Sequence, residues 1–372
     1  MNWPTKRSDK LASAVAAVLL ALSVLVLPSG WAAPKPKPAK PQAAKQTPTF
    51  YPPPPEQPRL QFLASYSSED DLRPKKSKLS TFVVGKAPPA KPIAKPYGLA
   101  FHQGNLYVCD SSGQVIHVLD FAKRRLRRFA PSGTAQLRTP INITIDKDGT
   151  RYVADTGRGQ VLRFGPDETF LGALGEKGEM RATDVAISGD RLYVANLKDH
   201  NVRVYDKTSL RQLFTIPRST NDEPSRLFMP VNVALDSKGR LYVSDLGANL
   251  VKQYDAEGKH LRSFGAHGDA PGEFARPKGL AVDREDRLYV VDAAAQVVQV
   301  FDPEGRLLLF FGEPTANDPA ALNLPAKVII DYDHLSLFQP LAAPGFKLEY
   351  LVLVTNQLGE RKINVYGFGR KQ

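Results

Sequence analysis

A five-residue pattern, Leu-Tyr-Val-x-Asp, recurs along the chain at nearly regular intervals. Five clear copies and one degenerate copy lie at 106–110, 151–155, 192–196, 241–245, 288–292 and 352–356. The tyrosines of the five clear copies are 45, 41, 49 and 47 residues apart. That period matches the four-stranded blades of β-propellers and is too long for ankyrin or leucine-rich repeats. The chain is therefore predicted to be a repeat protein built from sheets.

Each copy carries the apolar alternation of four short strands. An apolar run such as 279–283 leads through a turn into the tyrosine-containing strand, and apolar residues recur six and nine positions after each closing Asp or Asn. A fourth run, such as 260–264, completes the unit. A four-stranded unit cannot bury both faces alone, so the copies are expected to stack and close into a ring. The predicted fold is an all-β, six-bladed β-propeller of four-stranded blades.

The last copy indicates how the ring closes. It supplies three strands, at 327–331, 351–354 and 363–366. The alternating segment 59–66, upstream of the first copy, is predicted to be the missing outer strand of this last blade. Such an N-terminal strand would remove exposed sheet edges, which otherwise promote aggregation.

The order Pro-x-Gly-Leu-Ala-Val-Asp, Leu-Tyr-Val-x-Asp and Val-x-x-Phe/Tyr-Asp, best preserved at 277–302, resembles the NHL repeat family of six-bladed β-propellers. The resemblance covers residues 59–372. The third copy departs from the pattern, with Ala-Thr-Asp at 182–184 in place of Pro-x-Gly. Similar exported bacterial propellers occur alongside multihaem electron-transfer proteins, so the resemblance suggests an envelope redox complex as one setting.

The segment before the repeats has two parts. Residues 1–33 have the pattern of an export signal, with basic residues followed by the uncharged run 11–27. That run reaches the roughly 17 residues needed to span a bilayer, so a cleaved signal peptide and a retained membrane anchor both stay open. Residues 34–58 are rich in Pro and Lys and are predicted to form a disordered linker. The propeller is expected at 59–372, in the periplasm or cell envelope.

The chain carries a net charge of +12. Its densest basic cluster is predicted on the outer rim of blade one and comprises Lys123, Arg124, Arg125, Arg127 and Arg128. Basic patches can bind nucleic acid. Because an exported chain rarely meets nucleic acid, we expect an acidic protein, an envelope lipid or simply solvent as the counterpart.

Polar residues occupy several of the six positions that correspond to the Gly of Pro-x-Gly, on the strands expected to line the central channel. The six are Gly98, Asn142, Asp184, Asn232, Gly279 and Lys327. Asn142, Asp184 and Asn232 offer the oxygen ligands that Ca²⁺ prefers, and they resemble the metal site of calcium-dependent lactonase propellers. Such sites carry another carboxylate at the position of Gly98, and Lys327 would place a positive charge beside the ion. Both differences weaken a site for a divalent cation. The alternative to a metal site is that these polar side chains form hydrogen bonds with channel water and with the backbone.

The sequence gives catalysis little support. It has no Gly-x-Ser-x-Gly motif, no phosphate loop, and six histidines without metal-ligand spacing. Cys109 lies inside a predicted strand and is expected to be structural. The Asp or Asn that closes each repeat is expected to accept backbone N–H groups at a turn.

These observations predict a non-catalytic, extracytoplasmic propeller that binds an envelope protein as a monomeric scaffold, without a cofactor. Surface candidates are Arg203, Arg211, Arg218 and the insertion 332–347. The alternative is a calcium-dependent small-molecule hydrolase, lactonase or lyase that uses the channel. A glycan-binding module anchored by its N-terminus is a third option, and the membrane is a partner only if the N-terminal segment is retained.

Overall fold

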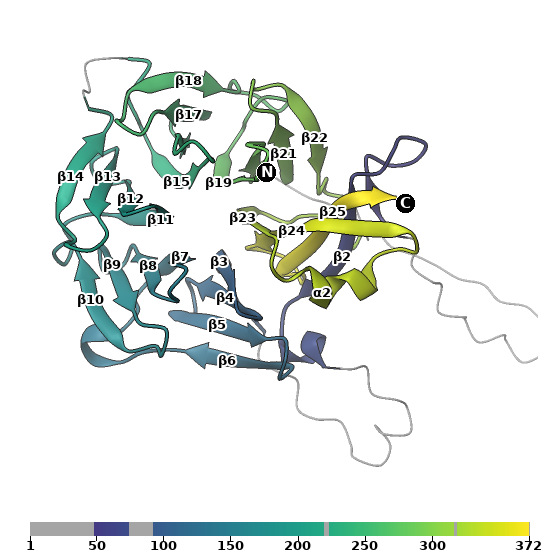
Figure 1. Cartoon of the computed structure of the whole chain (residues 1–372), viewed down its shortest axis with the longest axis horizontal. Helices are drawn as coiled ribbons and strands as arrows, with labels where there is room; N and C mark the ends of the chain where they lie inside the picture. Colours follow the sequence, from purple (N-terminus) through teal and green to yellow (C-terminus); the bar gives the residue numbers. More distant parts are fainter. Residues whose placement is uncertain (1–47, 74–91, 219–222, 316–317, 372) are drawn as a thin grey trace, which may run out of the picture. The chain divides into compact units, whose positions relative to one another are not determined.

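The computed structural model describes residues 48–73, 92–218, 223–315 and 318–371. These residues form six antiparallel sheets that follow one another around a ring (Figure 1). The chain is an all-β, six-bladed propeller, as the repeat predicts. The predicted signal segment 1–33 lies outside the described residues. Within the described residues, no helix is long and apolar enough to cross a membrane.

Blades one to five each contain four strands, which run in chain order from the centre of the ring outward. Blades one and two are β3 (Pro96–His102), β4 (Asn105–Asp110), β5 (Val115–Asp120), β6 (Arg125–Phe129), β7 (Pro140–Ile145), β8 (Arg151–Asp155), β9 (Gln160–Phe164) and β10 (Phe170–Leu174). Blades three and four are β11 (Ala182–Ser188), β12 (Arg191–Asn196), β13 (Asn201–Asp206), β14 (Gln212–Ile216), β15 (Pro230–Leu235), β16 (Leu241–Asp245), β17 (Leu250–Tyr254) and β18 (His260–Phe264). Blade five is β19 (Pro277–Val282), β20 (Leu288–Asp292), β21 (Val297–Phe301) and β22 (Leu307–Phe311).

Blade six combines both ends of the described chain. Its strands, from the edge inward, are β1 (Phe50–Tyr51), β2 (Leu60–Tyr66), β25 (Ile363–Lys371), β24 (Phe346–Asn356) and β23 (Pro325–Asp331). β2 pairs antiparallel with β25, which confirms the predicted closure by an N-terminal strand. β1 lies within the segment predicted as a disordered linker and pairs with β2. The pairing of β1 with β2 thus adds a strand that lies before residue 59, where the propeller is expected to begin.

The core consists of six apolar clusters, each shared by two neighbouring blades. Successive side chains of a strand point to opposite faces of its sheet. In β4, Leu106 and Val108 therefore pack against blade six, whereas Tyr107 and Cys109 pack against blade two. The innermost strands also contact one another in order, and β23 contacts β3. Burial raises the pKa of the Cys109 thiol, as expected for a structural cysteine.

The insertion in blade six folds against blade one. It contains α2 (Leu335–Phe338) and the short 3-10 helix η3 (Gln339–Leu341); two further 3-10 turns are η1 (Glu69–Leu72) and η2 (Gly133–Ala135). Phe338 is buried, and His334 stacks on Phe101 while its Nε2 accepts the N–H of Gly104 at 2.8 Å. Part of the insertion, which is a surface candidate in the sequence, therefore packs between blades six and one.

The residue that closes each repeat accepts backbone N–H groups, as predicted. In blade two, Asp155 accepts from Arg138 and Thr139, which lead into β7, at 2.7 and 2.9 Å. It also accepts from Arg158 of the following turn at 3.0 Å. One buried carboxylate thus fixes the start of the innermost strand and the turn after the second strand.

Replacing Asp155 with Ala is expected to lower the free energy of unfolding by about 2–4 kcal/mol, because three backbone donors lose a charged acceptor in a buried site. Chemical denaturation of the variant would measure the change. Asp167→Ala, which removes a fully exposed carboxylate from a turn of the same blade, is the matched control. Equal stability losses in both variants would contradict this role.

Candidate functional site

Four polar residues from four innermost strands meet inside the ring: Asn142, Asp184, Asn232 and Lys327, here called the central polar cluster. All four are buried, and Asp184 is only 1% exposed. Lys327 Nζ donates to Asp184 Oδ2 at 2.6 Å. Because β11 and β23 belong to blades three and six, which are opposite in the ring, this ion pair spans the centre of the propeller.

Hydrogen bonds tie the rest of the central polar cluster to this ion pair. Asp184 Oδ2 also accepts from Asn232 Nδ2 at 3.0 Å and from the backbone N–H of Val233 at 3.1 Å. Asn142 Nδ2 donates to the carbonyl of Thr183 at 2.8 Å. The side-chain oxygens of Asn142 and Asn232 have no hydrogen-bond partner among the described residues.

The two glycines of the same ring make room for this cluster. A Cβ at Gly98 would lie 2.1 Å from Asn142 Oδ1, and one at Gly279 would lie 2.6 Å from Lys327 Cα. Both contacts are far shorter than van der Waals distance. The predicted Gly positions are therefore explained by packing of neighbouring innermost strands.

The central polar cluster does not fit a calcium ion. Ca²⁺ takes six to eight oxygen ligands, usually with several carboxylates. Here the single carboxylate, Asp184, is already neutralised by the Lys327 ammonium, and the remaining oxygens are neutral amides. Among the described residues, no three His, Cys, Asp or Glu side chains gather in a metal-binding group.

A second group of charges lies where β19 and β3 begin, on the face that carries the connections between blades, here called the loop face. We call Lys95, Arg276 and Lys278 the cationic cluster. Lys95 and Arg276 are exposed, whereas Lys278 is 5% exposed and its Nζ lies 5.3 Å from the ring centre of Tyr97. None of the three forms an ion pair with a described carboxylate.

The charges of this cluster perturb one another. Burial lowers the pKa of Lys278 to about 8, and the positive charges of Arg276 and Lys95 contribute. Burial likewise raises the pKa of Tyr97 to about 12, with the negative charge of Asp184 adding to the shift and Arg276 opposing it. Lys278 is thus a nearly buried amine that lacks a described counterion and lies beside two further cations.

Sequence reasoning missed the cationic cluster, although a signal exists. Lys278 occupies the x position of Pro-x-Gly, where the other blades have an uncharged residue: Tyr97, Ile141, Thr183, Val231 and Ala326. A comparison of the six repeats at that one position singles out the lysine. Its proximity to Lys95, almost two hundred residues away, depends on ring closure and cannot be seen in the repeat pattern.

The predicted rim patch lies on β6 and the turn before it. Arg127 forms an ion pair with Glu168 of blade two, and Lys123 lies 3.9 Å from Asp120. Arg203 on β13 is held by Glu179 and Asp199. Several of these side chains are therefore neutralised by neighbours, unlike the cationic cluster.

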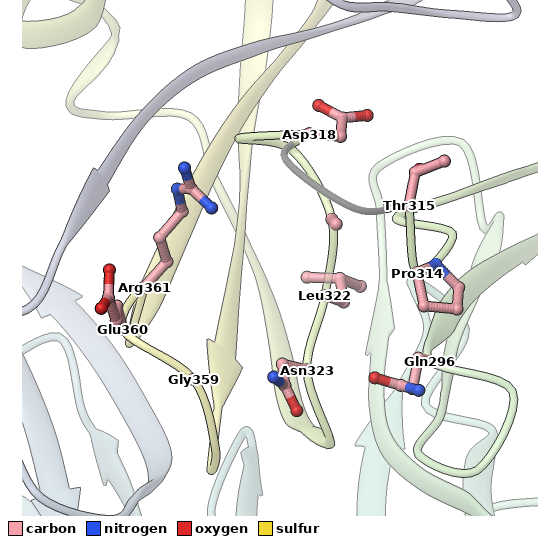
Figure 2. A pocket seen from close by; sticks show the side chains of 10 residues that line it. Gln296, Pro314, Thr315, Asp318, Leu322, Asn323, Gly359, Glu360 and Arg361 are labelled. Atoms are coloured by element: carbon pink, nitrogen blue, oxygen red, sulfur yellow. The ribbon is translucent and has the colours of Figure 1, made fainter. Parts of the chain in front are cut away.

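Pockets open on the loop face between blades. One, of about 300 Å³, lies between blades five and six. Figure 2 shows Glu360 and Arg361 on one side of it, Pro314 and Thr315 on the other, and Leu322 between them. Its charges are of mixed sign and it lacks a convergent set of donors or acceptors. Another pocket, between blades two and three, is basic.

Comparison with known proteins agrees with the fold. A family model described as a 6-bladed beta-propeller matches residues 201–309, from β13 into β22. This match supports a propeller family over the part of the chain that it covers. No curated protein matches the chain.

Several solved structures share the fold at low identity. A protein of unknown function from Bacteroides thetaiotaomicron is 15% identical, with a TM-score of 0.57, over 84% of this chain and 76% of that one. The calcium-binding protein regucalcin from Agrobacterium tumefaciens is 13% identical, with a TM-score of 0.53, over 76% and 92%. A streptogramin B lyase is 13% identical, with a TM-score of 0.52, over 75% and 85%. At such identities the likeness shows the fold alone.

Proposed function

We propose that this chain is a non-catalytic propeller of the NHL type, exported to the cell envelope, that docks an acidic segment of a partner protein on its loop face. The cationic cluster carries the proposal. Three cations lie together there, one of them almost buried, and no described carboxylate compensates them. A partner carboxylate at this position would supply the missing counterion.

The buried ammonium of Lys278 costs the folded chain free energy. Burying an ammonium without a counterion is unfavourable, and like charges nearby add to the cost. A pKa lowered from 10.5 to about 8 corresponds to about 3 kcal/mol against the charged form. The Tyr97 ring offsets part of this cost through a cation–π contact. The ammonium of Lys278 is already desolvated before binding. A partner carboxylate would therefore gain its attraction to this charge without a further desolvation cost for the amine.

The alternative function is calcium-dependent hydrolysis or lyase chemistry in the channel. Regucalcin, named a calcium-binding protein, and the streptogramin B lyase share the fold, and two amide oxygens of the central polar cluster lack described partners. Against it, Lys327 holds the only carboxylate of the cluster. Calcium in the purified protein, lost in Asp184→Ala, would favour this alternative over the docking function.

The docking function is tested by Lys278→Met. In-cell crosslinking of the tagged chain, followed by mass spectrometry, should capture an acidic envelope protein with the wild type, and at least about tenfold less with the variant. The same variant should be more stable at pH 7, since Met keeps the volume and removes an unpaired buried charge. Arg124→Gln/Arg128→Gln, which removes two exposed rim charges, is the control and should retain the partner.

The pH dependence of stability gives a second readout. Because the pKa of Lys278 is lower in the folded chain, the unfolded chain binds more protons between about pH 8 and pH 10.5. The stability advantage of Lys278→Met over wild type should therefore shrink as the pH rises through that window. Undiminished partner capture by Lys278→Met, with no gain in stability, would overturn the proposal.

A further inference from the structure

A basic pocket of about 460 Å³ lies on the loop face between blades two and three. It is formed by the β8–β9 turn, the β10–β11 connection and the β12–β13 turn. Its volume falls in the range of small-molecule sites. Four basic side chains line it and no carboxylate does: Arg158, Arg181, Lys198 and His200. We call it the blade 2–3 pocket.

Neutral oxygens hold two of these basic side chains in place. The guanidinium of Arg158 donates to the carbonyls of Thr134 and Gln136 at 2.7 and 3.0 Å and to Oε1 of Gln160 at 3.2 and 3.1 Å. Most of its N–H groups are therefore already used. Lys198 Nζ donates to the carbonyl of Gly178 at 2.9 Å. Carbonyl groups orient a cation without cancelling its charge. Lys198 donates one of its three ammonium hydrogens to Gly178, so its charge and its other donors are available to a ligand.

The carboxylates nearest in sequence have other partners. Glu179 and Asp199 both pair with Arg203. Asp155 accepts backbone N–H groups at the start of β7 and in the β8–β9 turn. Glu176 is exposed and does not line the pocket. Arg203 holds both of these carboxylates, and neither lines the pocket, so the charged side chains of the lining are all basic.

Two glycines shape the wall between the turns. Gly159 and Gly178 have φ values of +67° and +78°, which favour glycine. A Cβ at Gly159 would lie 2.7 Å from Gly178 Cα and 2.6 Å from the carbonyl oxygen of Met180. The turn of blade two therefore packs directly on the connection to blade three. This close packing brings the basic side chains of the two segments to one pocket.

We propose that the blade 2–3 pocket binds a small, multiply charged oxyanion of the phosphate type. Arg181, Lys198 and His200 offer donors to several anionic oxygens, and the guanidinium of Arg181 can bind such oxygens through paired hydrogen bonds, whereas Arg158 adds only its charge. A single carboxylate would compensate only one of these charges. The site is separate from the cationic cluster, and the proposal does not depend on the docking of a partner protein.

The test is calorimetric titration of the full chain with inorganic phosphate at constant ionic strength. We expect saturable binding to one site, weakened at least about tenfold in Arg181→Gln/Lys198→Gln, which removes two charges from the pocket. The matched control is Arg124→Gln/Arg128→Gln, with the same charge change on the outer rim, and it should bind phosphate as the wild type does. Thermal denaturation of each variant verifies that it is folded.

Each outcome bears on the proposal separately from partner docking. Absence of saturable phosphate binding, or equal weakening in pocket and rim variants, would overturn the pocket assignment. Phosphate binding that persists in Lys278→Met would support it, since that variant alters only the cationic cluster. Binding of a hexaglutamate peptide but not phosphate would show that the pocket accepts an acidic protein segment and would refute the small-oxyanion site.

Discussion

A chain that lacks residues 1–66 should fail to form a stable propeller. The deletion removes β2, which pairs along β25 from Leu60 opposite Phe368 to Tyr66 opposite Ile363. Each buried apolar side chain lost costs about 1.5–3 kcal/mol, and Leu60 and Tyr66 are both buried. Together with the lost strand pairing, the sum is comparable to the 5–15 kcal/mol by which a whole domain is stable. Near-ultraviolet circular dichroism and size-exclusion chromatography should show loss of fixed packing and aggregation through the exposed β25 edge.

Deletion of residues 1–46 is the matched control, because Thr47–Gln372 forms one compact unit. It should melt as the full chain does. Addition of a peptide of residues 47–68 should restore packing to the chain that lacks residues 1–66, since the strand acts by pairing and burial alone. A cooperative melt of the shorter chain at the full-chain temperature would show that ring closure does not need β2.

The fold could be predicted because its determinants are local and repeated. Strand alternation places Leu106 and Tyr107 on opposite faces of one sheet. The same alternation of side chains between the two faces occurs in every blade. In blades one to five the closing Asp or Asn accepts N–H groups within about twenty residues of itself, as Asp155 does, and in blade six Asn356 accepts from Asn323. Even closure by β2 followed from counting strands in the last copy. β1 escaped prediction because a two-residue strand flanked by prolines has no periodicity to detect.

The polar groups inside the ring could be located by the repeat, but their pairing could not be predicted. The repeat placed Asp184 and Lys327 at equivalent positions of different blades. It could not show that the Lys327 side chain reaches across the ring to Asp184, because that depends on the ring diameter and on the side chains between them. The same limit applies to Lys95 and Lys278, which ring closure brings together from blades one and five.

Asp184→Asn should destabilise the propeller by about 3–5 kcal/mol, the usual cost of removing one partner of a buried ion pair. The variant keeps the size of the side chain and its capacity to accept from Asn232 and Val233. It removes the negative charge that Lys327 contacts at 2.6 Å, and this leaves a buried ammonium uncompensated. Urea denaturation would measure the loss, which should exceed that of any single exposed charge.

The double variant Asp184→Asn/Lys327→Met distinguishes the contribution of the ion pair to stability from that of the packing around it. Met fills a similar volume and carries no charge, so the second substitution should recover most of the stability lost in Asp184→Asn. Lys327→Met alone should be costly, because it leaves the Asp184 carboxylate in the centre of the ring without its cation. Additive losses in the double variant would show that the two side chains do not interact. In that case Asp184 would be free to serve as a ligand, and calcium binding by Asn142, Asp184 and Asn232 would become the better account of the centre of the ring.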